Sequence, residues 1–214
     1  MIAIECPQGS SAWHAARAGC ITASMFAEAR AKLKSGPNKG EPTKAAQDYA
    51  FRLAVERISG EPLDNGFETW QMRRGHELEP EARMAHEIRT GLIVQQVGLV
   101  KTDDGAFGAS ADGFIDDDGV SEYKCFLAPE KLRAFHIDQD ADGIKDQVQG
   151  VLWITGRKWA HIGMYCPVLK PVGRELWLGE YDRDDNYIEE LEADLWQFKK
   201  LVDEYESKLR AKAA

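Results

Sequence analysis

The sequence predicts an α/β fold that forms one domain over residues 1–214. Helical patterns occupy most of residues 13–90, strand patterns follow in the middle of the chain, and a long amphipathic helix ends it. With 214 residues and 43% apolar side chains, the chain can bury one sizeable core, and it lacks a long polar or Pro/Gly/Ser-rich linker. One α/β domain is therefore expected.

Three helical patterns come first, at 13–30, 43–58 and 70–90. Within the first, Thr22, Ala23 and Ser24 supply N-cap chemistry, so a new helix can open there. Within the third, Pro80 has no amide hydrogen to donate. This helix is therefore expected either to kink at Pro80 or to begin near Glu79.

The middle of the chain has the pattern of a sheet with one crossover helix. Strands are expected at 93–101, 106–115, 120–126, 159–166 and 174–181, with a helix at 141–155 between the third and the fourth. A last helix at about 185–211 carries one apolar stripe, made of Ile188, Leu191, Leu195, Phe198, Val202, Tyr205 and Leu209. The stripe can cover the chain's own sheet or meet another subunit. We expect the first, because coiled coils usually run for more heptads.

The second and third strands are predicted to pair as a hairpin. Asp116, Asp117, Asp118 and Gly119 supply the turn, in which Gly119 can take a positive φ angle. Folding the chain about position 117 sets Asp112 roughly opposite Glu122 on the next strand.

The third strand then adds a lysine to these carboxylates. Because residues two apart project from one face of a strand, Glu122 and Lys124 lie together, while Tyr123 and Cys125 project from the other face. Two facing carboxylates repel each other unless a cation joins them, and Mg²⁺ prefers such oxygen ligands. A neighbouring ammonium could then orient a nucleophile or offset developing charge in phosphodiester hydrolysis. The alternative is a simple turn at Asp112 followed by an exposed cross-strand charge pattern.

The net charge of −9 is unevenly distributed. A basic stretch at about 30–44 contains Arg30, Lys32, Lys34, Lys39 and Lys44 around the turn residues 35–38. It is interpreted as a mobile loop that could touch phosphates, with a plain solvated loop as the alternative. A local basic field can bind a polyanion even when the whole chain is acidic.

The cysteine pattern and the hydropathy of the sequence argue against several classes of protein: disulfide-rich, metal-cluster, exported and membrane proteins. The four cysteines, Cys6, Cys20, Cys125 and Cys166, are scattered without a Cys-x-x-Cys pair, which disfavours a disulfide framework, a zinc site or an iron–sulfur cluster. The five histidines show no paired ligand spacing, so packing or surface roles are expected for them. Without an apolar span or an export signal, a cytoplasmic protein with no membrane partner is expected.

Five segments occur in an order that resembles the lambda-type phage alkaline exonucleases, the YqaJ-like viral recombinase family. They are Trp13-His-Ala-Ala-Arg17-Ala-Gly-Cys-Ile-Thr22-Ala-Ser24, Arg74-Gly-His-Glu-Leu-Glu79-Pro-Glu-Ala-Arg83, Ser110-Ala-Asp112-Gly113, Glu122-Tyr-Lys124 and Gln147-Val-Gln149. The resemblance covers roughly residues 13–167. It implies a restriction-endonuclease-like, PD-(D/E)xK core in which helices flank a central mixed β-sheet.

The resemblance also implies roles for residues of the site. Asp112 and Glu122 would bind two Mg²⁺ ions, for which Mn²⁺ could substitute, and the backbone carbonyl of Tyr123 would complete one metal shell. Lys124 resembles the catalytic lysine. Two further residues complete the implied site. Glu79 would contribute to the metal site or to activating the water, and Gln149 would steady the nucleophile and the lysine. The resemblance assigns no role to Gln147.

Four other positions match residues of the family that hold the DNA end. Arg17 and Ser24 correspond to a pocket for the terminal 5′ phosphate. Lys34 occupies the place of a basic residue that reaches into the duplex, and Met72 the place of an apolar wedge between terminal base pairs. Lys34 and Met72 differ from the family's side chains, and lysine lacks the planar fork of arginine.

The implied activity is processive 5′-to-3′ digestion of double-stranded DNA ends, which releases mononucleotides and leaves 3′ overhangs for single-strand-annealing recombination. Implied partners are 5′-phosphorylated duplex ends, two more copies of the chain in a homotrimeric ring, and a single-strand annealing protein, in a bacterial cell that carries the phage or prophage. Two alternatives stay open: a site-specific or structure-specific endonuclease of the same fold, and a non-catalytic DNA-end binding module. The presence of Asp112, Glu122 and Lys124 disfavours the second.

Overall fold

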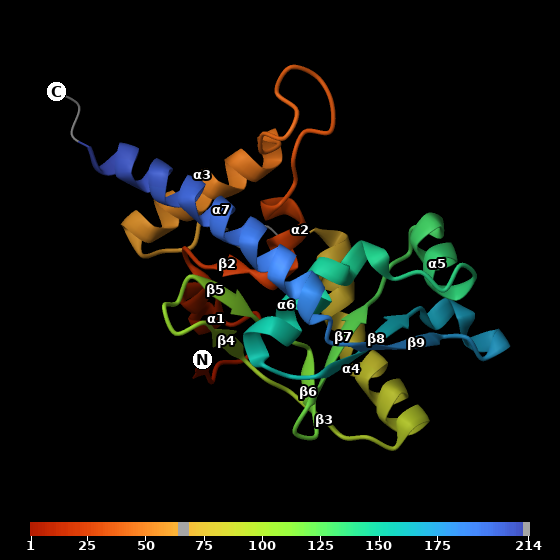
Figure 1. Cartoon of the computed structure of the whole chain (residues 1–214). Helices are drawn as coiled ribbons and strands as arrows, with labels where there is room; N and C mark the ends of the chain where they lie inside the picture. Colours follow the sequence, from red (N-terminus) through yellow and green to blue (C-terminus); the bar gives the residue numbers. More distant parts are fainter. Residues whose placement is uncertain (64–68, 212–214) are drawn as a thin grey trace.

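The computed structural model describes residues 1–63 and 69–211, and within them two mixed β-sheets lie among helices (Figure 1). One sheet has the order β1-β4-β5-β2 and consists of β1 (Ile2–Ile4), β4 (Leu99–Lys101), β5 (Phe107–Ala109) and β2 (Ile21–Thr22). The other has the order β3-β6-β7-β8-β9 and consists of β3 (Val94–Gln95), β6 (Gly113–Ile115), β7 (Gly119–Lys124), β8 (Trp159–Tyr165) and β9 (Leu176–Asp182). The pairs β2–β5 and β7–β8 are parallel and the other pairs antiparallel, so the mixed α/β prediction is confirmed.

Two of the expected strands are divided between these sheets. The range 93–101 splits into β3 and β4, and the range 106–115 splits into β5 and β6. At Gly98, between β3 and β4, a Cβ atom would lie 2.3 Å from the carbonyl oxygen of Ile4, so the chain passes too close to β1 for any side chain. The expectation of one continuous strand in each range is wrong. β1 was not expected from the sequence.

The first helical range is also interrupted. It contains α1 (Ser11–Arg17), the strand β2, the 3₁₀ turn η1 (Ala23–Met25) and α2 (Phe26–Ala29). Gly19 has a φ angle of +69°, which ends the first helix and turns the chain into β2. A helix beginning after Thr22 is confirmed, but a helix through the whole range is wrong.

The next two helices follow the sequence more closely. Thr43 caps α3 (Lys44–Ser59) through a hydrogen bond from the amide of Ala46, close to the expected start. In the same way, Thr69 caps α4 (Trp70–Thr90), which continues through Pro80. A beginning near Glu79 is therefore wrong.

A crossover helix joins the parallel strands β7 and β8, as expected. It is α6 (Lys145–Thr155), preceded by the 3₁₀ turn η2 (Asp142–Ile144) and by a helix that the sequence did not indicate, α5 (Pro129–His136). A third 3₁₀ segment, η3 (Pro167–Val172), links β8 to β9.

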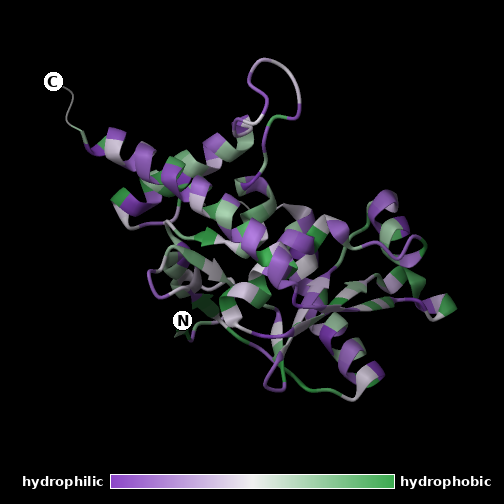
Figure 2. Cartoon of the chain, viewed as in Figure 1, coloured by the Kyte–Doolittle hydropathy of each residue, from purple (hydrophilic) through white to green (hydrophobic). Residues whose placement is uncertain are grey.

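The last helix, α7 (Asp185–Arg210), has nearly the expected bounds. Its stripe is buried from Ile188 to Val202 and packs mainly on α3 and α6, where Phe198 stacks on Tyr49 with ring centroids 5.2 Å apart. The visible face of α7 is largely hydrophilic (Figure 2). The stripe therefore packs within its own chain as expected, but mostly on helices rather than on a sheet, and Leu209 is exposed.

Residues 31–43, which we call the arm, project from the body beyond α2 and α3 (Figure 1). Within residues 1–63 and 69–211, no helix is both long and apolar enough to cross a bilayer.

Candidate active site

The hairpin of β6 and β7 has the register that the sequence predicts. Gly113 pairs with Ser121, so Asp112 lies opposite Glu122, and the amide of Asp112 donates to the carbonyl of Ser121 at 3.1 Å. The Asp112 carboxylate is fixed from the other strand, since its Oδ2 accepts a 2.5 Å hydrogen bond from the amide of Tyr123. The two carboxylate residues are thus held by main-chain contacts.

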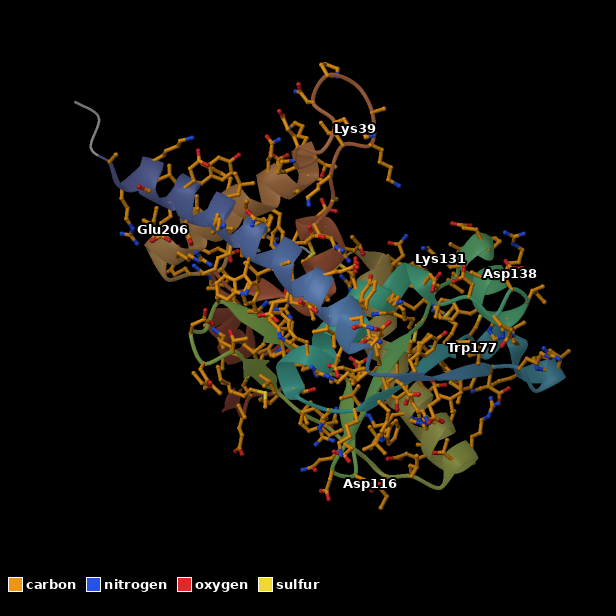
Figure 3. All side chains as sticks on the ribbon, viewed as in Figure 1. Lys39, Asp116, Lys131, Asp138, Trp177 and Glu206 are labelled. Carbon is orange, nitrogen blue, oxygen red and sulfur yellow. The ribbon has the colours of Figure 1, made fainter. Side chains whose placement is uncertain are left out.

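The turn of this hairpin differs from the expectation in one detail. Asp116 rather than Gly119 takes the positive φ angle, at +45°. Gly119 is required for another reason, because a Cβ atom there would lie 2.2 Å from the ring of Trp159. Figure 3 shows Asp116 at the tip of the hairpin.

Glu122 and Lys124 form one half of the site with Gln147 of α6. The Nζ of Lys124 donates to Glu122 Oε1 at 2.8 Å and to Gln147 Oε1 at 3.0 Å, and the amide nitrogen of Gln147 donates to Glu122 Oε1. Glu122 is 4% exposed, and its second oxygen, Oε2, is buried without a hydrogen-bond partner. One oxygen of Glu122 therefore holds the lysine, and the other is left for a ligand.

Gln149 does not lie at this site. Its amide nitrogen donates to the carbonyl of Asp182 at 2.9 Å, and its oxygen accepts from the amide of Asp184 at 2.9 Å. Gln149 thus fixes the connection from β9 to α7, and the resemblance pointed to the wrong glutamine of the pair. The missed residue, Gln147, was part of the same Gln-x-Gln segment.

Glu79 approaches the hairpin from α4. Its Oε1 is 2.8 Å from Nη2 of Arg83, one helical turn further on, and both side chains are partly buried. Its negative charge acts on Asp112. Arg83 is a second residue of the site that the sequence did not single out, although it stands in one of the quoted segments.

The charges of the site shift two pKa values. Burial first, and then the charges of Glu122 and Glu79, raise the pKa of Asp112 well above its usual value. Burial alone would lower the pKa of Lys124, but the carboxylates of Glu122 and Asp112 outweigh burial and raise it. The lysine is therefore an ammonium at neutral pH, and with Arg83 it offsets only part of the charge that Asp112, Glu122 and Glu79 can carry.

The donor set fits a hard divalent cation such as Mg²⁺. Asp112, Glu122, Glu79 and the Tyr123 carbonyl offer oxygen atoms, and Glu122 Oε2 is buried without a partner. Glu79 is engaged by Arg83, and among the described residues no three His, Cys, Asp or Glu side chains are gathered as a metal cluster. Asp112 and Glu122 are thus the placed pair, and Glu79 would have to turn from Arg83 to join them.

A cleft of about 1140 Å³ opens beside the hairpin. Among its lining residues are Asp112, Arg17 of α1, and Glu79 and Met72 of α4, which come from three separate segments of the sequence. Met72 lies half-exposed in the first turn of α4. The cleft therefore connects part of the predicted metal site with two of the positions predicted to hold the DNA end.

Arg17 is held in a fixed position at this cleft. Its guanidinium carbon lies 4.0 Å from the ring centroid of Trp13, and its Nη2 donates to Thr22 Oγ1 at 3.1 Å. Trp13 in turn donates to Ser110 Oγ at 2.9 Å, two residues before Asp112. The arginine fork and the hairpin are thus linked through one tryptophan.

The other two residues predicted to contact DNA, Ser24 and Lys34, are not among the described residues that line the cleft. Ser24 is exposed in η1, and the side chain of that segment that contacts Arg17 is Thr22. Lys34 is exposed on the arm, as is Lys39 (Figure 3).

The fold is shared with solved exonucleases. The chain is 29% identical to an alkaline exonuclease, LHK-Exo, from Laribacter hongkongensis, with a TM-score of 0.81 over 95% of this chain and 97% of that one. It is 30% identical to LHK-Exo in complex with dAMP, with a TM-score of 0.82 over the same shares. A phage-related exonuclease from Haemophilus somnus shares the fold at 16% identity, with a TM-score of 0.68 over 89% of this chain and 96% of that one.

These neighbours define the chain as an α/β protein of the alkaline exonuclease fold. Residues 12–158 match the YqaJ-like viral recombinase domain, and the chain belongs to this family. A comparison with curated proteins gave no match. The family and the neighbouring structures support a nuclease of the exonuclease type.

Proposed function

We propose that this protein is a Mg²⁺-dependent, processive 5′-to-3′ exonuclease that acts on double-stranded DNA ends, releases mononucleotides and leaves 3′ single-stranded overhangs. The observation that carries the proposal is the hairpin that sets Asp112 opposite Glu122, which holds Lys124, at the edge of a cleft that also contains Arg17. The binding of dAMP, a mononucleotide, by LHK-Exo supports the proposed product.

The chain's own side chains account for the chemistry around the metal. Mg²⁺ at such a site acidifies water and polarises a phosphodiester oxygen, and Asp112, Glu122, Glu79 and the Tyr123 carbonyl are the groups that would hold two ions. Lys124 keeps its proton and presents an ammonium beside the scissile position, where negative charge develops. Gln147 and Glu122 hold the Nζ of that lysine in place.

The proposed polarity rests on Arg17. A guanidinium fork suits the oxygens of a terminal 5′ phosphate, and stacking on Trp13 leaves less side-chain freedom to lose on binding. Retention of that phosphate at one end of the cleft presents the 5′-ended strand to the hairpin. Ser24, Met72 and the exposed Lys34 are proposed as further contacts with the DNA end.

The polarity is tested with linear duplexes that carry 5′-phosphate or 5′-hydroxyl ends, in Mg²⁺ and in Mn²⁺. Mononucleotides should leave from the 5′ end, faster from phosphorylated ends. Release from 3′ ends would refute the polarity, discrete internal fragments would indicate an endonuclease, and end binding without cleavage in either metal would indicate a binding module. Arg17→Ala should mainly lower processivity and the preference for phosphorylated ends.

The catalytic assignments are tested by single substitutions. Asp112→Ala, Glu122→Ala and Lys124→Ala should each abolish cleavage with the fold retained, as checked by circular dichroism. Lys158→Ala is the matched control, because this exposed lysine pairs with Asp118 at the turn end of the same hairpin. Cleavage by any of the three variants would remove that residue from the mechanism.

The assembly and the biological setting complete the proposal. We propose a homotrimeric ring, because enclosure of the DNA gives processivity without sequence-specific contacts and tolerates an acidic subunit with a basic channel. A single-strand annealing protein would load on the exposed 3′ strand in the cytoplasm of a bacterium that carries the phage or prophage. Light scattering tests the ring, since a stable monomer would contradict it.

A further inference from the structure

We propose that Arg30 is a positioning residue that fixes Gln147 in the site and ties it to the arm, residues 31–43. The inference rests on the proposed function, because it takes the arm as a part that touches duplex DNA and Gln147 as part of the cutting site. Four structural observations support it.

The arm is an internally bonded element rather than an open loop. The amide of Leu33 donates to the carbonyl of Glu41 at 2.8 Å, and that of Gly40 donates to Leu33 at 2.9 Å. At its base, the amide of Thr43 donates to the carbonyl of Ala31 at 3.0 Å. Because its two sides are paired, a displacement of the exposed tip is transmitted to the base.

Arg30 stands directly before this base and contacts two helices. Its Nη1 donates to Asp146 Oδ1 of α6 at 2.8 Å, while its Nε and Nη2 donate to Asp194 Oδ2 of α7 at 3.1 and 2.8 Å. The three side chains are 18–26% exposed, so these charge-assisted bonds are partly shielded from water. Lysine could not make these contacts, because it lacks the planar fork.

The start of α6 depends on this ion pair. The N-cap residue, Ile144, makes no side-chain cap, whereas Asp146 lies in the first turn, where a carboxylate is favoured by the helix dipole. Tyr187 Oη also donates to Asp146 Oδ1, at 2.5 Å. Arg30 and Tyr187 therefore anchor the first turn of α6 through the carboxylate of Asp146.

Gln147 is the next residue of that turn. Its amide group joins Lys124 and Glu122 directly, as described above. A shift of the first turn of α6 moves Gln147 relative to β7, so the order arm, Arg30, Asp146, Gln147 forms a connected path to the lysine.

The coupling is measured with a double-mutant cycle of Arg30→Met and Gln147→Ala. If Arg30 acts through Gln147, Arg30→Met lowers kcat by about tenfold, and the double variant is no slower than Gln147→Ala alone. A purely structural or DNA-affinity role would make the two losses multiply, or raise KM with kcat unchanged, and either result overturns the proposal. Lys199→Met, which removes a partly buried lysine paired with Asp203 on α7, is the matched control and should keep wild-type kcat.

A second measurement does not need cleavage. Hydrogen exchange of residues 145–149 is followed with a duplex end in Ca²⁺, in wild type and in Arg30→Met. Duplex binding should slow exchange there in wild type but not in the variant. Duplex binding without any change at 145–149 refutes this inference alone, whereas a protein that binds duplex ends but never cuts in Mg²⁺ or Mn²⁺ refutes the proposed function.

Discussion

The two glutamines of α6 offer a clean separation of activity from stability at the scale of single residues. Gln147→Ala should lower kcat about 10- to 100-fold with little loss of stability, because its amide only orients Lys124 and Glu122. Gln149→Ala should keep kcat and lose about 1–3 kcal/mol of unfolding free energy, because it leaves the Asp182 carbonyl and the Asp184 amide unpaired.

Initial rates on a linear duplex and urea unfolding curves measure the two effects. A larger rate loss for Gln149→Ala than for Gln147→Ala would restore the assignment that the resemblance suggested.

The difference between these glutamines could not be read from the sequence. Residues two apart on an α-helix point about 200° away from each other, so they face opposite sides. Which side faces β7 depends on the rotation of α6, and packing fixes that rotation, with Val148, Val151 and Leu152 buried in the core. The pairing of Asp112 with Glu122, in contrast, was predictable. It follows from the two-residue alternation of side chains along each strand and from a turn centred at position 117.

A second residue-scale prediction concerns His86, which is fully buried behind β7. Its Nδ1 lies 2.7 Å from Tyr123 Oη and its Nε2 lies 2.8 Å from His161 Nδ1. Burial first, and then the neighbouring His161, lower the pKa of His86 from 6.5 to about 4. The folded state therefore takes up this proton only near pH 4, whereas the unfolded chain takes it up near pH 6.5.

The stability contributed by neutral His86 is therefore present above pH 6.5 and is lost as the pH falls towards 4. The loss amounts to at most about 3.5 kcal/mol, from about 1.4 kcal/mol per pKa unit. Urea unfolding at steps between pH 7 and pH 4 measures it. His86→Gln should flatten the slope in this window, and an unchanged slope would show that other groups cause it.

At the scale of elements, α7 provides the strongest packing prediction. Phe198→Ala should lower the free energy of unfolding by about 3–5 kcal/mol, because the ring is 4% exposed and stacked on Tyr49. Leu209 lies on the same apolar stripe but is 45% exposed, so Leu209→Ala should change the free energy of unfolding by at most about 0.5 kcal/mol. Thermal or urea unfolding checks both. Equal effects would mean that the end of α7 is covered in solution.

Elements were predictable where one local pattern decides them. The stripe of α7, the cap at Thr43 and the strands β7, β8 and β9 each have a continuous periodicity and appear close to the expected bounds. The range 93–101 failed because its break comes from a distant contact: Gly98 passes against Ile4, which is far away in sequence. No local pattern reports such an approach.

At the scale of the whole molecule, the proposed metal site lies where separate parts of the fold meet. Asp112 stands between β5 of one sheet and β6 of the other, Glu122 lies on β7, and Glu79 comes from α4. Lys124 pairs with Glu122 and Arg83 pairs with Glu79, so three carboxylates face two cations. The carboxylates at the junction of the two sheets therefore outnumber the cationic side chains that pair with them.

Mg²⁺ bound at this site, as proposed, should raise the stability of the fold. Because the pKa of Asp112 is raised well above its usual value, its ionised form costs stability at pH 7, and a bound cation should remove that cost. Mg²⁺ at about 100 times its Kd should stabilise the fold by about 2.7 kcal/mol, which raises Tm by roughly 5–10 °C for a chain of this size.

Asp112→Asn separates the charge effect from general ion effects. The amide cannot ionise, so this variant should have a higher Tm than wild type without metal and should gain little from Mg²⁺, while it loses cleavage. Asp118→Asn, at the turn end of the same hairpin, is the matched control and should keep the full Mg²⁺-dependent rise. Differential scanning calorimetry with EDTA and with Mg²⁺ measures both. If Asp112→Asn gained as much from Mg²⁺ as wild type, the stabilising ion would lie elsewhere in the molecule, and the assignment of the metal to the junction of the two sheets would fail.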